Sequence, residues 1–279
     1  MTTASDTYPI VLACGMTRFD RIPPWRWMAA HAGESMHYFR RIRAALDKAG
    51  FSAHHTRVDW AGPVENRARQ LASEIDSILA LTGRSKVHII AHSMGGLDAR
   101  WMIAKLGYAP KVHSLTTIGT PHHGTPVADW CVVKRSRSQE IISWLLHRGL
   151  DIRGLYDLTT EAAASRNEML APLESNSGVV YRTWGGRVSF WETFVWVKPK
   201  YLLLKNAYDE PLNDGLVPLR SARWKHEYFQ GALPWDHFNM LGWWMPARMV
   251  AGDFSRRRFE SGVREFYVRL AQEVVAVES

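Results

Sequence analysis

The stretch Lys86-Val87-His88-Ile89-Ile90-Ala91-His92-Ser93-Met94-Gly95-Gly96 decides the fold of this chain. Its first half is a short, β-branched run, which predicts a buried strand. Beyond it Leu97, Trp101 and Ala104 recur at helical spacing, which predicts a helix. Ser93 therefore falls where a strand turns sharply into a helix.

Small residues flank that serine two positions before and two positions after it, at Ala91 and Gly95. A turn this sharp crowds both positions, strains the serine backbone and lifts the hydroxyl clear of the sheet. Glycine is usual at the first position, and the methyl group of Ala91 still fits there. The alternative is a plain serine turn before an ordinary helix, but the flanking strand and helix favour a nucleophile at Ser93.

Strands and helices alternate through the rest of the chain, which predicts an α/β fold. A mostly parallel central sheet, flanked by helices on both faces, is the arrangement that such alternation favours. Right-handed crossovers then place the carboxyl ends of the strands, and any site, along one edge. We expect strands at 9–14, 52–58, 86–90, 112–118 and 181–184, and helices at 39–50, 64–83, 94–107 and 259–274.

The length of 279 residues suits a single domain, 1–279. Residues 125–178 break the alternation, and we interpret them as an inserted cap or lid. A second candidate insertion is 187–200, which is rich in aromatic residues. These aromatics form either the core of the cap, or an acyl pocket and a lid that faces lipid.

A serine hydroxyl becomes a nucleophile when a base takes its proton and a carboxylate orients that base. In this topology the chain order is serine, acid, histidine. His237 lies in a late, turn-like loop that fits the base. Asp214 stands on an Asp-Gly turn and fits the acid. The other acids that remain open are Asp209, Glu210 and Asp236, and we interpret His226, in an apparent strand, as structural.

Two backbone amides are expected to form an oxyanion hole beside Ser93. One belongs to Met94, which follows the nucleophile. The other is expected from the loop after the first strand, where Gly15 lets the chain turn and Met16 has the right position. The alternative is that Gly15 marks only a loop. Our candidates for contacts with substrate are Thr17, His92, Trp144 and Leu145.

The net charge of +8 comes from scattered basic residues, and no nucleic-acid-binding signature accompanies them. Solvated faces, or attraction to anionic lipid head groups, account for the charge better than nucleic acid does. No run reaches the roughly 18 apolar residues of a membrane span. The first residues form no basic and then apolar leader, so we expect a cytoplasmic protein with Cys14 and Cys131 reduced.

Several stretches together resemble the bacterial triacylglycerol lipases of the α/β-hydrolase fold. The resemblance spans most of residues 8–125 and 178–242 in order and spacing. It implies Ser93 as nucleophile, Asp214 as acid and His237 as base, with Met16 and Met94 in the oxyanion hole. The stretches are Pro9–Met16, the turn around Ser93, Thr117–Gly124, Tyr181–Gly186, Asn213–Val217 and Asp236-His237.

The resemblance implies a serine ester hydrolase that acts on lipid or acyl esters through an acyl-enzyme, with transient contact with a lipid interface. A phospholipase, thioesterase, polyester depolymerase or acyltransferase would share these residues. A non-catalytic lipid-binding protein is the alternative from another class.

Three departures from the family pattern qualify what the resemblance implies. Cys14 stands where the family's oxyanion loop begins with histidine, so that side chain's hydrogen bonds to the loop are lost. Secreted relatives hold calcium through an aspartate two residues after the base, and Asn239 stands there. We therefore expect neither metal nor cofactor. Those relatives are exported, whereas the missing leader favours an intracellular lipase or esterase.

Overall fold

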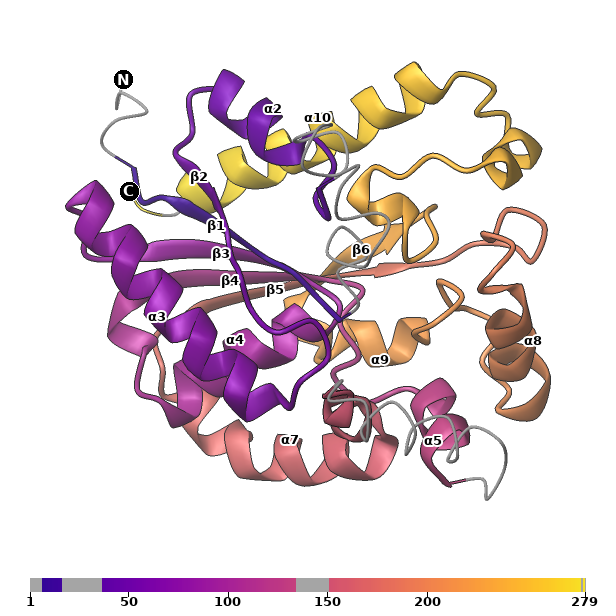
Figure 1. Ribbon diagram of the computed structural model, residues 1–279, viewed down its shortest axis with the longest axis horizontal. Helices are drawn as coiled ribbons and strands as arrows, with labels where there is room; N and C mark the ends of the chain where they lie inside the picture. The colour runs from indigo at the N-terminus through magenta and orange to yellow at the C-terminus, as the bar shows by residue number, and fades with distance from the viewer. Residues whose placement is uncertain (1–6, 17–36, 134–150, 277, 279) are drawn as a thin grey trace.

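The computed structural model describes residues 7–16, 37–133, 151–276 and 278. Within them, six strands pair in parallel in the order β2-β1-β3-β4-β5-β6 (Figure 1). The parallel sheet that the sequence predicts is confirmed, and the strand expected around His226 is β6, which begins three residues later. The strands are β1 (Ile10–Ala13), β2 (Ala53–His55), β3 (Val87–His92), β4 (Val112–Ile118), β5 (Val180–Gly186) and β6 (Phe229–Leu233).

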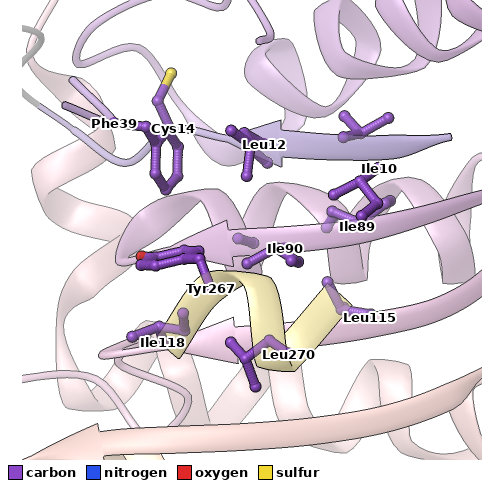
Figure 2. Packing of buried hydrophobic residues seen from close by; sticks show 14 of the residues in the cluster. Ile10, Leu12, Cys14, Phe39, Ile89, Ile90, Leu115, Ile118, Tyr267 and Leu270 are labelled. Carbon is purple, nitrogen blue, oxygen red and sulfur yellow. The ribbon is translucent and has the colours of Figure 1, made fainter. Parts of the chain in front are cut away.

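Helices cover both faces of this sheet (Figure 1). On one face lie α2 (Ile42–Lys48) and α10 (Arg256–Val275). On the other lie α3 (Val64–Thr82), α4 (Met94–Lys105) and α7 (Thr160–Ser175), with the short α9 (Leu219–Arg223) against β5. The helices expected at 39–50, 64–83, 94–107 and 259–274 are present, each with slightly different ends. Figure 2 shows how Tyr267 and Leu270 of α10 pack over the apolar strand residues.

The shorter elements lie between these layers or near the carboxyl ends of the strands. Figure 1 places α5 (Pro126–Val133) and α8 (Lys198–Ala207) beyond the carboxyl ends. His226, expected inside a strand, begins a 3₁₀ turn instead, because pairing with β5 starts only at Phe229. The 3₁₀ turns are η3 (Ala109–Lys111), η4 (Arg153–Leu158), η5 (His226–Tyr228), η6 (Asn239–Leu241) and η7 (Pro246–Ala251).

The stretch that we interpret as a cap, 125–178, contributes to two places. Its later part includes α7, which packs against α4 beside the sheet. Its earlier part includes α5 and η4, which contact each other. Residues 134–150 of this stretch lie outside the described residues, and the limits of the cap stay a prediction.

In the described part of the chain, every helix is too short or too polar to cross a membrane. Cys14 and Cys131 are both free thiols, Cys14 buried and Cys131 half-buried.

Gly95 determines how closely α4 approaches β1. A Cβ atom at this position would lie 2.6 Å from the backbone oxygen of Ala13 and 2.7 Å from that of Cys14. Gly262, which is also helical, has no atom within 4 Å of the equivalent point. Substitution of Gly95 therefore tests the close packing, and substitution of Gly262 tests helix propensity alone.

We expect Gly95→Ala to lower the free energy of unfolding by about 1–3 kcal/mol, because backbone atoms must shift to admit the methyl group. Gly262→Ala should raise it by about 0.5–1 kcal/mol, because alanine is the better helix former. Urea unfolding of both variants measures the difference. A Gly95→Ala variant as stable as the parent would contradict the close packing of α4 on β1.

Candidate active site

Ser93 occupies the turn between β3 and α4 with φ 55° and ψ −133°, a combination that costs energy in any residue other than glycine. The turn is fixed from both sides. The Ser93 amide donates to the carbonyl of Ile118 at 3.0 Å, and the Ser93 carbonyl accepts from the Thr120 hydroxyl at 2.7 Å. The small residue at Gly95 is required because β1 lies against it. The sharp turn expected from the sequence is therefore present.

His237 lies between Ser93 and Asp214. Its Nε2 is 2.9 Å from Ser93 Oγ, and its Nδ1 is 2.8 Å from Asp214 Oδ2. Asp214 is fully buried and His237 is almost so. The three residues singled out in the sequence, 121 and 23 positions apart, thus form one chain of hydrogen bonds at the carboxyl edge of the sheet.

The turn at Asn213-Asp214-Gly215 orients the Asp214 carboxylate. Its Oδ1 accepts from the amides of Leu216 at 2.9 Å and Val217 at 2.7 Å, which leaves Oδ2 for the histidine. The Asp214 carbonyl also accepts from the His237 amide at 3.0 Å. The acid is therefore held on its own turn and joined to the loop of the base.

The other three acids considered do not contact the imidazole of His237. Asp209 is exposed, and Glu210 pairs with Arg220. Asp236 is buried and accepts three backbone amides. Asp214 is therefore the carboxylate that the structure places on the histidine.

The loop after β1 touches the nucleophile. A Cβ atom on Gly15 would lie 2.7 Å from Ser93 Cβ, and Met16 lines the same cavity as Ser93. Met94 is the first residue of α4, where backbone amides have no acceptor within the helix. Both amides expected in the oxyanion hole thus belong to segments beside the Ser93 hydroxyl.

A buried arginine holds this loop where the family's histidine is missing. Arg67 Nη2 donates to the Cys14 carbonyl at 2.9 Å, and the same guanidinium pairs with Asp98 at 2.7 Å. Arg67 is fully buried, which by itself lowers the pKa of its guanidinium, but the charge and hydrogen bonds of Asp98 outweigh burial and the pKa is raised. The sequence analysis missed Arg67, because the helical pattern of 64–83 marks only its apolar positions.

Ser93 and His237 open into a cavity of about 660 Å³ whose walls are mostly apolar. Such a cavity suits a hydrocarbon chain better than a polar ligand. Its walls come from segments far apart in the sequence. Prominent among the lining residues are Met16, Tyr38, Leu155, Leu158, Phe194, Trp196, Phe238, Leu241, Trp243 and Met245.

Of the four residues expected to contact substrate, His92 lies on this wall. Its Nδ1 is 2.7 Å from the Tyr38 hydroxyl. Burial, and then the neighbouring His237, lower the pKa of His92 well below its usual value, so the ring is neutral. Thr17, Trp144 and Leu145 lie outside the described residues.

The position that would supply a calcium ligand in secreted relatives is not free for one. Asn239 is buried, its Nδ2 donates to the Trp243 carbonyl at 2.8 Å, and its Oδ1 accepts from the Asp236 amide at 3.5 Å. Because both amide atoms are engaged, Asn239 does not fit a calcium site. Elsewhere in the described ranges, no three histidine, cysteine or acidic side chains gather as metal ligands.

Comparisons with known proteins agree with this architecture. Residues 51–139 match the family model described as a PGAP1-like alpha/beta domain. The structure is similar to the Staphylococcus hyicus lipase, with a TM-score of 0.72 and 18% identity over 97% of this chain and 96% of that one. It is also similar to mature Bacillus licheniformis lipase BlEst2, with a TM-score of 0.65 and 22% identity over 83% of this chain and 85% of that one. At these identities the structures show the fold.

Sequence relatives connect the chain to named lipases. It is 30% identical to Triacylglycerol lipase 2 of Saccharomyces cerevisiae over 74% of this chain and 62% of that protein. It is 33% identical to a triacylglycerol lipase of Vibrio cholerae over 60% of this chain and 49% of that protein. The chain thus spans less than two thirds of the length of these relatives. The chain is therefore similar in sequence to triacylglycerol lipases and shares its fold with solved lipases.

Proposed function

We propose that this protein hydrolyses lipid or acyl esters with Ser93 as nucleophile, His237 as general base and Asp214 as the acid that orients it. The observation that carries the proposal is the hydrogen-bonded series Ser93 Oγ–His237–Asp214 at 2.9 and 2.8 Å. The relatives named triacylglycerol lipase support the same reaction class.

The reaction begins when Ser93 Oγ attacks the ester carbonyl carbon and His237 Nε2 takes the hydroxyl proton. Asp214 stabilises the resulting imidazolium through Nδ1. The amides of Met16 and Met94 donate to the oxyanion, and removing one such donor typically costs roughly 3–4 kcal/mol. His237 then protonates the departing alcohol, which leaves the acyl group on Ser93.

Water completes the cycle. It attacks the acyl carbon while His237 takes its proton, and His237 then returns that proton to Ser93 Oγ as the bond from Ser93 Oγ to the acyl carbon breaks and the free carboxylic acid leaves. The apolar cavity would hold the acyl chain throughout, because it opens directly at Ser93 and His237.

Ser93→Ala should reduce kcat for p-nitrophenyl esters by a factor on the order of 10⁵ or more while leaving the fold intact, since it removes the attacking atom. Initial rates from acetate to palmitate, with this variant as the blank, measure the effect. Undiminished hydrolysis by the variant would refute the assignment. The chain-length profile separates a long-chain lipase from a short-chain esterase, and a matched thioester panel covers the thioesterase alternative.

We further propose that the cavity mouth contacts lipid surfaces. The interfacial patch consists of six exposed apolar residues on two segments, 191–196 and 249–254. These segments lie side by side, because Arg248 Nη1 is 4.0 Å from Glu192 Oε1. Lys198 lies over the rings of Phe190 and Trp191, and α8 carries two further lysines, which suits anionic head groups. The interfacial patch is Trp191, Val195, Trp196, Met249, Val250 and Phe254.

Trp191→Asp combined with Phe254→Asp should lower co-sedimentation with phosphatidylcholine vesicles that contain phosphatidylglycerol by about tenfold or more, because each charge must be desolvated at the surface. Hydrolysis of soluble p-nitrophenyl acetate should stay unchanged. Leu81→Asp, at an exposed leucine on α3, is the matched control. Equal losses in the control and the double variant would refute the patch.

A further inference from the structure

Asp236 is a buried carboxylate that the proposed chemistry does not use. It is fully shielded from solvent, although it immediately precedes His237. No cation of the described residues forms an ion pair with it. A buried carboxylate without a counter-ion is costly unless both oxygens accept hydrogen bonds. Its partners therefore show why this position holds an acid.

The two oxygens of Asp236 bind two different loops. Oδ1 accepts from the amides of Phe238 at 3.0 Å and Asn239 at 2.8 Å, on the loop of the base. Oδ2 accepts from the amide of Phe194 at 2.8 Å, 42 positions earlier in the chain. The carboxylate thus joins the loop of His237 to the segment between β5 and α8.

That segment forms part of the cavity wall. Phe194 and Trp196 line the cavity, and the Phe194 ring meets Phe238 edge-on with 5.6 Å between centroids. The same segment packs against the acid's turn, because Val197 and Thr193 lie within 3.0–3.2 Å of the point where Gly215 would carry a Cβ. The position of the aromatic wall relative to the base is therefore fixed at Asp236.

Resting on the proposed function, we propose that Asp236 is a positioning residue that determines specificity for long acyl chains. An acetyl group would need only Ser93, His237 and the oxyanion amides. A long acyl chain must also contact Phe194 and Trp196, so its hydrolysis depends on the position of these two side chains in the cavity wall. Losing the bond to the Phe194 amide should therefore affect long esters more than short ones.

Asp236→Asn tests this proposal, because it leaves the shape of the side chain almost unchanged. It removes one acceptor, since an amide nitrogen cannot accept a hydrogen bond from the Phe194 amide. We expect kcat/KM for p-nitrophenyl decanoate to fall about tenfold more than kcat/KM for the acetate. Asp47→Asn is the matched control, since Asp47 also accepts a backbone amide, from Ala53 at 3.2 Å, outside the cavity. Equal losses for both esters in Asp236→Asn, or the same chain-length change in the control, would overturn the proposal.

The parent protein offers a second test that needs no variant. Burial, reinforced by the negative charge of Asp214, raises the pKa of Asp236 to about 6, against three backbone amides that lower it. The carboxylate is thus charged above about pH 6 and takes up a proton below it. The other charged groups of these loops are His237, which serves both esters, Glu192, which faces Arg248, and the exposed Arg187. The decanoate-to-acetate ratio should fall as pH drops through about 6.

Amide hydrogen exchange separates this proposal from the proposed function. Exchange of peptides containing Phe194 should be faster in Asp236→Asn than in the parent, whether or not the protein turns over esters. If the parent hydrolyses no ester, the proposed function fails, and exchange alone decides whether Asp236 holds the wall. A pH-independent ratio, or unchanged exchange at Phe194, would contradict the role of Asp236.

Discussion

The close contact between the start of α4 and the end of β1 is the constraint on which the rest of this molecule depends. Gly95 lies against the carbonyls of Ala13 and Cys14, so Ser93 must turn through a positive φ to connect β3 to the helix. The same contact brings the loop of Gly15 against the serine. One packing constraint therefore places the nucleophile and both proposed oxyanion amides within one small region.

The remaining chemistry is brought to that region by parallel strands, whose carboxyl ends share an edge. The turn between α8 and α9 supplies Asp214, and the loop after β6 supplies His237. Buried polar groups then fix the loops: Arg67 holds the Cys14 carbonyl, and Asp236 holds the Phe194 amide. These charges contribute positioning, because removing one partner would leave the other buried and unsatisfied.

Local sequence patterns predicted the parallel sheet, its covering helices and the three residues that meet at the site. Their signals are short-range: β-branched runs, helical spacing, the small residues around Ser93, and the Asp-Gly turn at Asp214. The hydrogen bonds from Arg67 to Cys14 and from the Phe194 amide to Asp236 were not predicted. Each joins residues distant in sequence, and neither has a local sequence pattern. His92 was expected to contact substrate, and its hydrogen bond with Tyr38 could not be read from spacing.

The central claim is that Ser93 is a nucleophile activated by His237. Reaction with a fluorophosphonate, followed by intact mass and peptide mapping, tests it most directly, because the reagent needs the activated serine and no particular acyl chain. The account predicts one adduct, on the peptide containing Ser93, absent from Ser93→Ala and formed at least about 100-fold more slowly in His237→Ala. An adduct elsewhere, or equal labelling rates in the parent and His237→Ala, would contradict it.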